Sequence, residues 1–322
     1  MFLRMVRFLS LLVVTLLLSN PMIPAFAADR VRVAIASVYP PFSIPFAAQE
    51  LGYYKERNLD VELTVYGGGG PAQEAMAAGA ADMLTNSPMG AALAIGKGVK
   101  QHIVAMTGPT TPQGWYVMVH GNSPIRSMKD LNGKTIGITA KGSTTDFLAL
   151  WAAKHADVDV RTIPLGQALL PAFSSGQVDA AILYPVLSYH GLIEDGDRSL
   201  ADLGAVMGPV VPDTWVASDE FINGRADVLR RFLQANMKAV AYMQRNETWS
   251  IAFLKKYLDE KDDRVVKMCY ERIVKKLRTD GLVRPEWLKS SLDLAVLAGV
   301  RNVPTVEQIF VGKFVPVEPN GK

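Results

Sequence analysis

Apolar and polar positions follow two different periods along the first third of the chain. Residues 30–37 (RVRVAIAS) and 60–66 (DVELTVY) alternate with a period of two and are rich in valine, which predicts strands. Residues 46–58 carry apolar side chains close to a period of 3.6, which predicts a helix. A glycine turn followed by Pro71 predicts a second helix to about residue 78, and Ser87-Pro88 predicts the start of a third.

The same order of elements recurs after residue 134. Strands are predicted at 134–140 and 159–163, with helices at 144–155 and 167–174. A G-x-x-D pattern at Gly79 and Asp82 returns 97 residues later at Gly176 and Asp179. The repeat predicts two similar α/β lobes with mostly parallel sheets, whose ligands bind outside the carboxyl ends of the strands.

Two extended segments, residues 115–120 and 210–217, are the natural crossovers between the lobes. The rest of the chain is predicted to be mainly helical, with an apolar stripe from Val228 to Met243. We expect this helical tail to pack on the first lobe. Lobe 1 would then be discontinuous, with residues 28–114 and 215–322, and lobe 2 would hold residues 115–214.

Residues 1–27 have the layout of a secretory signal peptide. Two arginines precede an apolar run from Phe8 to Leu18, and Ala25-Phe26-Ala27 fits a cleavage site. The apolar run is shorter than the about 20 residues that span a bilayer, so an uncleaved anchor is the weaker alternative. We expect cleavage near Ala27 and a periplasmic protein.

Charge and cysteine content narrow the range of partners and chemistry. Removing Arg4 and Arg7 with the leader lowers the formal net charge from +3 to +1, so no basic excess indicates nucleic acid or a membrane surface. Cys269 is the only cysteine, so an intrachain disulfide is impossible, and a buried thiol is expected. We expect a monomer.

Motifs that would indicate catalysis fail on their spacing. Residues 67–72 (GGGGPA) formally fit G-x-G-x-x-A, but four consecutive glycines satisfy almost any glycine pattern. Residues 90–97 (GAALAIGK) place five residues between the glycines where a phosphate loop has four. A G-x-S-x-G elbow is absent from the sequence, and the four histidines are scattered. The sequence therefore predicts no catalytic residue, no metal site and no cofactor.

Four predicted helices begin where a strand ends, at residues 67–71, 85–88, 142–146 and 184–185. Their backbone N–H groups would point outward with the helix dipole behind them, which suits an anionic or hydrogen-bonding ligand. Each one alone is ordinary capping, but four of them at one face of the sheets favour a binding site.

The stretch KGSTTD at residues 141–146 illustrates both interpretations. Ser143 and Asp146 match the capping pattern S-x-x-D, so we expect Ser143 to cap the helix, while Thr144 and Thr145 contact the ligand. Asp146 also places a carboxylate near the helix start, which argues against a strongly anionic ligand.

Residues 130–137 carry the string D-L-x-G-K-x-I-G, followed by the serine-bearing helix start, and further characteristic stretches lie at residues 46–63, 67–83, 173–183 and 215–222. On these stretches, nearly the whole mature chain resembles the periplasmic substrate-binding proteins of NitT/Tau-type ABC transporters, which bind sulfonates, taurine, nitrate or the thiamine pyrimidine precursor. The most specific likeness is the string at residues 130–137. The resemblance implies a bilobal type II periplasmic binding fold, with two lobes joined by crossovers, that delivers a small molecule to a membrane permease and ATPase.

The resemblance also implies which segments hold the ligand. These are the loop after the first strand, the end of the third strand, the helix start in lobe 2, the loop after the last strand of lobe 2 and the return crossover. The corresponding residues are Tyr39, Phe42, Ser43, Asn86, Ser87, Gly142, Ser143, Thr144, Thr145, Tyr184 and Trp215.

The residues leave the ligand open. An aromatic rim with hydroxyl and amide donors favours a neutral or monoanionic organic molecule, and the candidates are sulfonates, nitrate, pyrimidine precursors, riboflavin and aromatic acids. Two other functions fit the same fold: an enzyme like the related pyrimidine synthase, and a sensing subunit that signals to a membrane receptor.

Overall fold

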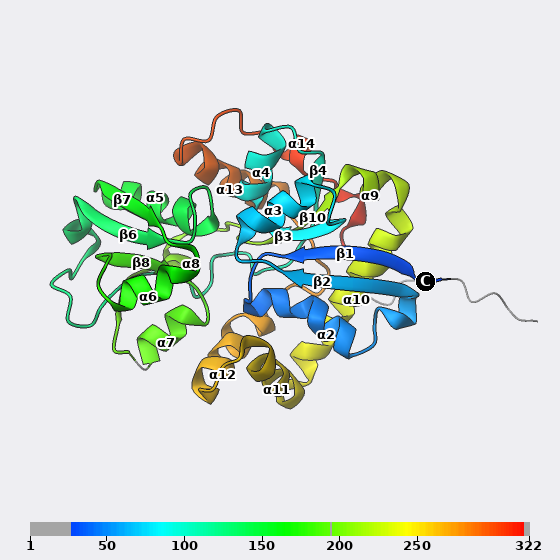
Figure 1. Ribbon diagram of the computed structural model, residues 1–322, viewed down its shortest axis with the longest axis horizontal. Coiled ribbons are helices and arrows are strands. Elements are labelled where there is room, and N and C mark those ends of the chain that lie inside the picture. The colour runs from blue at the N-terminus through cyan, green and yellow to red at the C-terminus, as the bar shows by residue number, and fades with distance from the viewer. Residues whose placement is uncertain (1–26, 194, 319–322) are drawn as a thin grey trace, which may run out of the picture.

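The computed structural model describes residues 27–193 and 195–318, and it contains two five-stranded sheets that lie side by side (Figure 1). The predicted leader lies, except for Ala27, outside the described residues. The first sheet has the order β2 (Leu59–Val65), β1 (Asp29–Ile35), β3 (Met83–Asn86), β10 (Thr214–Ser218), β4 (Gln101–Met106). The second has the order β7 (Val160–Pro164), β6 (Lys134–Ile138), β8 (Ala180–Leu183), β5 (Tyr116–Val119), β9 (Arg198–Asp202). The bilobal α/β architecture is therefore confirmed.

The two sheets share one topology, as the repeat predicts, but they are mixed. In the first sheet β1 pairs in parallel with β2 and β3, whereas β10 is antiparallel to both β3 and β4. In the second, β6 pairs in parallel with β7 and β8, whereas β5 is antiparallel to β8 and β9. Four of the five strands in each sheet nevertheless run in one direction, as the prediction of mostly parallel sheets requires. The exceptions are β10 in the first sheet and β5 in the second, which each enter from a crossover and run against their neighbours.

The repeated aspartates Asp82 and Asp179 make the same hydrogen bond in each sheet. The Asp82 carboxylate accepts a hydrogen bond from the backbone N–H of Arg32 in β1, at 2.8 Å. Asp179 accepts one from the backbone N–H of Thr135 in β6, also at 2.8 Å. Each aspartate thus ties the turn before β3 or β8 to the neighbouring parallel strand, β1 or β6, which gives the repeat its physical cause.

Most helices lie where the pattern predicts them. They are α2 (Ile44–Glu50), α3 (Gly69–Ala77), α4 (Pro88–Gly96), α5 (Thr144–Ala156), α6 (Leu169–Ser174), α7 (Leu187–Ile193), α8 (Leu203–Val206), α9 (Asp219–Gly224), α10 (Ala226–Arg245), α11 (Glu247–Leu258), α12 (Asp263–Arg272), α13 (Pro285–Leu297) and α14 (Val306–Ile309). The single helix predicted over residues 46–58 is wrong, since α2 ends at Glu50. Gly52, at φ +76°, takes the chain out of the helical region.

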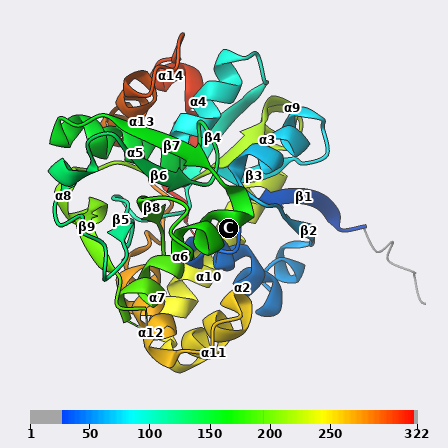
Figure 2. The same ribbon diagram turned by 60° about the vertical axis from the view of Figure 1, so that its left-hand side comes forward.

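The helical tail contacts both lobes, which extends the expectation that it packs on the first. Helix α10 packs against α2 of the first lobe, whereas α12 contacts α7 of the second. Helix α13 lies against both α4 and α5, and Figure 2 shows α13 and α14 at one end of the molecule, with α11 and α12 at the other. The ends of strands β1, β2 and β3 face the ends of β6 and β8 between the contact of α12 with α7 and the contacts of α13 with α4 and α5. Within the described part of the chain, helices long and apolar enough for a membrane span are absent.

Candidate functional site

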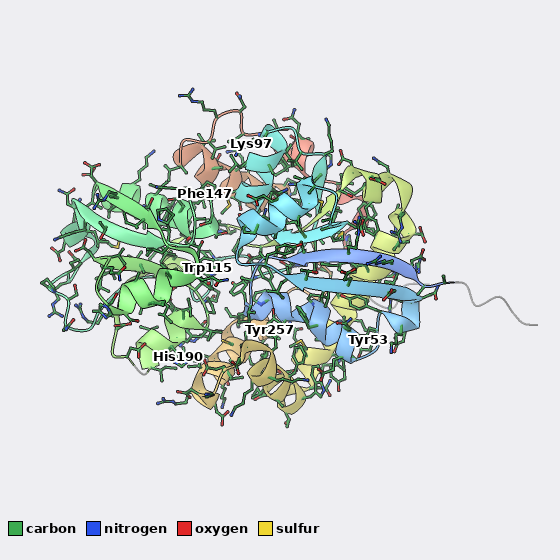
Figure 3. The ribbon with its side chains drawn as sticks, in the orientation of Figure 1. Tyr53, Lys97, Trp115, Phe147, His190 and Tyr257 are labelled. Carbon is green, nitrogen blue, oxygen red and sulfur yellow. The ribbon has the colours of Figure 1, made fainter. Side chains whose placement is uncertain are left out.

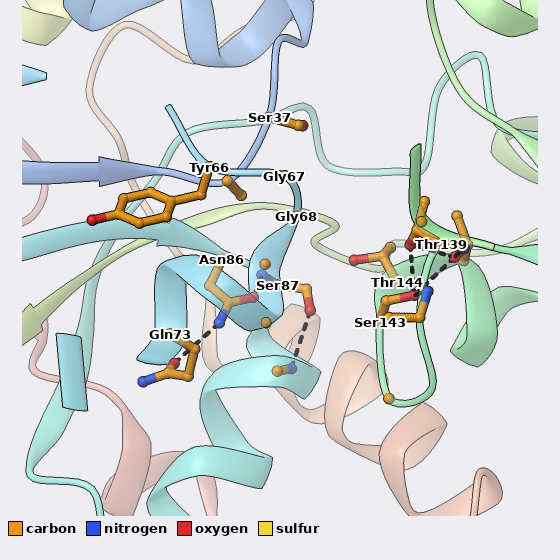
Figure 4. A pocket seen from close by; sticks show the side chains of 18 of the residues that line it. Ser37, Tyr66, Gly67, Gly68, Gln73, Asn86, Ser87, Thr139, Ser143 and Thr144 are labelled. Atoms are coloured by element: carbon orange, nitrogen blue, oxygen red, sulfur yellow. Dashed lines mark hydrogen bonds between the residues drawn. The ribbon is translucent and has the colours of Figure 1, made fainter. Parts of the chain in front are cut away.

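A cavity of about 820 Å³ lies between the two lobes, at the strand ends where the sequence predicts a ligand. Both lobes line it, as the close view in Figure 4 shows, and its size is in the range of small-molecule sites. The polar or aromatic side chains around it are Ser37, Tyr39, Phe42, Tyr66, Gln73, Glu74, Asn86, Ser87, Lys97, Trp115, Thr139, Lys141, Ser143, Thr144, Thr145, Gln167, Tyr184 and Asp213.

The first wall is built around Asn86 at the end of β3. Its Nδ2 donates to Gln73 Oε1 at 3.1 Å, and its Oδ1 accepts from the backbone N–H of Ser87 at 2.8 Å. The Ser87 hydroxyl in turn accepts from the N–H of Gly90 and caps α4. A Cβ atom at Gly90 would come within 2.6 Å of Asn86 Oδ1, so glycine is needed there to leave room for the amide. The wall is a preformed set of amide and hydroxyl groups.

The opposite wall is a cluster of three hydroxyls at the start of α5. The hydroxyls of Thr139, Ser143 and Thr145 lie 2.8–2.9 Å from one another. Ser143 is the N-terminal flanking residue of α5 but makes no capping bond with its side chain, so the predicted capping role of Ser143 is wrong. Its hydroxyl is held by the neighbouring threonines instead.

Asp146 accepts a backbone hydrogen bond near the start of α5, as the capping pattern predicts, but the donor is Gly142 and not Ser143. Its carboxylate accepts from the backbone N–H of Gly142 at 2.9 Å and from the hydroxyl of Thr162 at 2.8 Å. The ammonium of Lys141 lies 3.6 Å from the same carboxylate and contacts Thr162. The charge of Lys141 is therefore paired with Asp146, on the lobe 2 side of the loop.

Aromatic side chains close the cavity at the crossover end. Tyr39 packs edge-on against Phe42, Trp115 and Tyr184, with ring centroids 5.1, 6.0 and 6.2 Å away. Trp115 Nε1 donates to the Tyr39 hydroxyl at 3.1 Å, which joins the first crossover segment to the first lobe. Figure 3 places Trp115 at the junction between the lobes.

Asp213 lies beside these aromatic rings, on the return crossover. Burial raises the pKa of its carboxyl group to about 7, although the neighbouring hydroxyl of Tyr39 lowers it in part. Burial also raises the pKa of the Tyr39 hydroxyl well above its usual value, and the neighbouring charge of Asp213 adds to the rise.

Nine of the eleven residues predicted to hold the ligand line this cavity, and Ser43 and Trp215 do not. Ser43 is fully buried and donates its hydroxyl hydrogen bond to the backbone oxygen of Pro40. Trp215 is 1% exposed and packs edge-on against Phe232 of α10. The prediction that these two residues face the cleft is wrong, because Trp215 points from β10 into the core beneath the sheet. The binding role of the other nine stays a prediction.

Several residues that line the cavity were not predicted from the sequence. Thr139, Gln73 and Gln167 are ordinary polar residues in their segments, with no pattern to mark them. Asp213 did carry a signal, since it is a lone acid within the apolar crossover Val210-Val211-Pro212-Asp213-Thr214-Trp215. Groups of three or more side chains able to hold a metal ion are absent from the described residues.

Comparisons with known proteins agree with this architecture. The NMT1/THI5-like family profile matches residues 40–248. The alkanesulfonate-binding protein SsuA from Xanthomonas axonopodis pv. citri, solved with MOPS bound, is 20% identical with a TM-score of 0.73, covering 92% of this chain and 98% of its own. The SsuA protein of Escherichia coli, a periplasmic aliphatic sulphonate binding protein, is also 20% identical with a TM-score of 0.73, covering 91% and 94%.

A third similar structure is the Candida albicans CA3427 gene product, described as having the generic periplasmic binding protein fold. It is 19% identical with a TM-score of 0.73, over 91% of this chain and 99% of its own. Among curated proteins, the search found no matching sequence. The solved structures share the fold of this chain over nearly its whole length.

Proposed function

Because the chain belongs to the NMT1/THI5-like family and has the two-lobed periplasmic binding fold, we propose that it is a solute-binding protein of an ABC importer. It captures one small organic molecule between its lobes and delivers that molecule to a permease and an ATPase in the membrane. The binding proteins among the similar structures support this function.

The observation that carries the proposal is the cavity itself. Each wall of the cavity comes from one of two lobes that share the same topology, and crossover segments connect the lobes at one end of the cavity. Such a hinge lets the lobes separate to admit a solute and close around it. The cleft is also narrow: a Cβ atom at Gly67 would lie 3.1 Å from Gln167 Nε2 across it, and one at Gly142 would lie 3.1 Å from Leu93.

The lining favours a mostly organic solute. Aromatic rings cover the crossover end, and amides and hydroxyls line the two walls. With lobe 1 taken as residues 28–114 and 215–322 and lobe 2 as residues 115–214, each lobe contributes one wall. The signal-peptide pattern supports a periplasmic location, and we propose that the mature protein acts as a monomer.

A ligand screen on residues 28–322 tests the function. Sulfonates, nitrate, pyrimidine precursors, riboflavin and aromatic acids are compared by the melting temperature of the protein. A true solute raises it by several degrees at about 100 times its dissociation constant, because it binds only the native state.

Two variants on one helix separate the cleft from other surfaces. Thr144→Trp fills the cavity from the first residue of α5 and abolishes the shift. Lys154→Trp, an exposed position in the last turn of the same helix, leaves the shift unchanged. A shift that survives Thr144→Trp would contradict binding in the cleft.

A further inference from the structure

Asp213 is a buried carboxylate at the crossover end of the cleft. Asp213 is only 5% exposed, and it lines the cavity. Its Oδ2 atom has no hydrogen-bond partner among the described residues. An ionised carboxylate in such a place is costly unless a partner supplies donors or positive charge.

The protein shapes the space around this carboxylate but supplies little to offset its charge. Gly108, in the segment between β4 and β5, leaves room for it, since a Cβ atom there would lie 3.0 Å from Oδ2. The Tyr39 hydroxyl lies near the carboxyl group and partly lowers its pKa, and its oxygen already accepts a hydrogen bond from Trp115. Among the described residues, no cationic side chain forms an ion pair with Asp213.

The charges elsewhere on the cavity wall do not offset Asp213. Lys141 is paired with Asp146 in the second lobe. Lys97 and Glu74 are both exposed and carry opposite charges. Among the described lining residues, the one deeply buried charge is therefore a negative one, and aromatic rings stand beside it.

We propose that Asp213 recognises a hydrogen-bond donor of positive character on the solute: a protonated amine, an amidine or an amino-substituted heterocycle. The donor lies against the Asp213 carboxyl group, and the rings of Tyr39, Trp115 and Tyr184 pack beside it, because aromatic faces attract cations. The inference rests on the proposed function and narrows its solute class. It separates this cleft from one built for a sulfonate, which would place a second negative charge beside the carboxylate.

A series of ligands that share a phenyl ring tests the head group alone. Benzamidine, benzamide, benzoate and benzenesulfonate are titrated into the mature protein by calorimetry at pH 8. Benzamidine is expected to bind roughly tenfold or more tightly than either anion. Tighter binding of benzoate or benzenesulfonate would overturn the inference, and so would the absence of benzamidine binding at about 10 mM.

Two carboxylate variants then locate the effect. Asp213→Asn is expected to weaken benzamidine roughly tenfold or more, with benzenesulfonate unchanged or improved. Glu286→Gln removes one exposed negative charge in the first turn of α13, outside the cavity, and should change the affinity for benzamidine less than about twofold. An unchanged benzamidine affinity in Asp213→Asn, or an equal loss in Glu286→Gln, would overturn the assignment.

The phenyl series on the unmodified protein decides the inference even if Asp213→Asn fails to fold. A failure of the inference about Asp213 can also be told apart from a failure of the proposed function. A benzenesulfonate that binds tightly and is lost in Thr144→Trp would refute the role of Asp213 while leaving a solute-binding protein.

Discussion

Replacing Asp213 with asparagine should stabilise the unliganded protein, and the gain should grow with pH. The buried carboxyl group has a pKa of about 7 in the folded chain, against 3.8 for an unperturbed aspartate. The folded state therefore holds this proton more tightly than the unfolded state does. Stability is greatest below the unfolded pKa and falls as the pH rises through the folded pKa.

The size of the effect follows from the two pKa values. One pKa unit corresponds to about 1.4 kcal/mol, so the rise from 3.8 to about 7 costs about 4 kcal/mol of unfolding free energy at pH 8. At pH 5 the cost is about 1.5 kcal/mol, because the folded-state group is still protonated. The advantage of Asp213→Asn over the parent should therefore grow by about 2.5 kcal/mol between pH 5 and pH 8.

Urea unfolding of the ligand-free protein at both pH values measures this change. Any pH-independent cost of burying the asparagine amide cancels in the difference between the two pH values. Asp130→Asn is the control, since the backbone amides of Arg126 and Ser127 lower the pKa of Asp130 and keep that group ionised from pH 5 to pH 8. Its loss of stability should be the same at both. If the Asp213→Asn advantage were also independent of pH, the buried, uncompensated carboxyl group would be refuted.

Three further substitutions test the placement of individual side chains. Trp215→Phe should lower the free energy of unfolding by about 1–3 kcal/mol and leave solute affinity within about twofold, because Trp215 packs on Phe232 outside the cavity; a large loss of affinity in calorimetry would contradict that. Gly90→Ala should lower the melting temperature despite the better helix propensity of alanine, because its Cβ would press on Asn86 Oδ1; a stabilised variant would contradict the packing of this wall. Ser143→Ala should cost about 1 kcal/mol in urea unfolding by breaking the hydroxyl cluster at the start of α5, and an unchanged stability would show that the cluster is not formed.

The parts of the fold that the sequence predicts correctly are those fixed by local chemistry. The repeat of Gly79 and Asp82 at Gly176 and Asp179 predicts similar lobes, because each aspartate binds the backbone of the corresponding strand, β1 or β6, in its own lobe. Ser87-Pro88 predicts the start of α4, because a cap and a proline act within one turn.

Other features that the sequence did not predict depend on distant segments. Trp215 lies in a strand whose two faces are both covered, so alternation could not show which face meets the cleft. The antiparallel direction of β5 and β10 depends on how the crossovers return, which no local pattern records. The environment of Asp213 is assembled from Tyr39, Gly108 and Trp115, which are separated from it by about a hundred residues or more.

The fate of the bound molecule tests the central claim most directly. The mature protein is saturated with a ligand found in the screen, passed through a desalting column and examined by native mass spectrometry before and after denaturation. A solute-binding protein should carry one ligand per chain and release it with its mass unchanged, whereas Thr144→Trp should carry none. Release of a chemically altered product, or retention of the ligand by Thr144→Trp, would contradict the account.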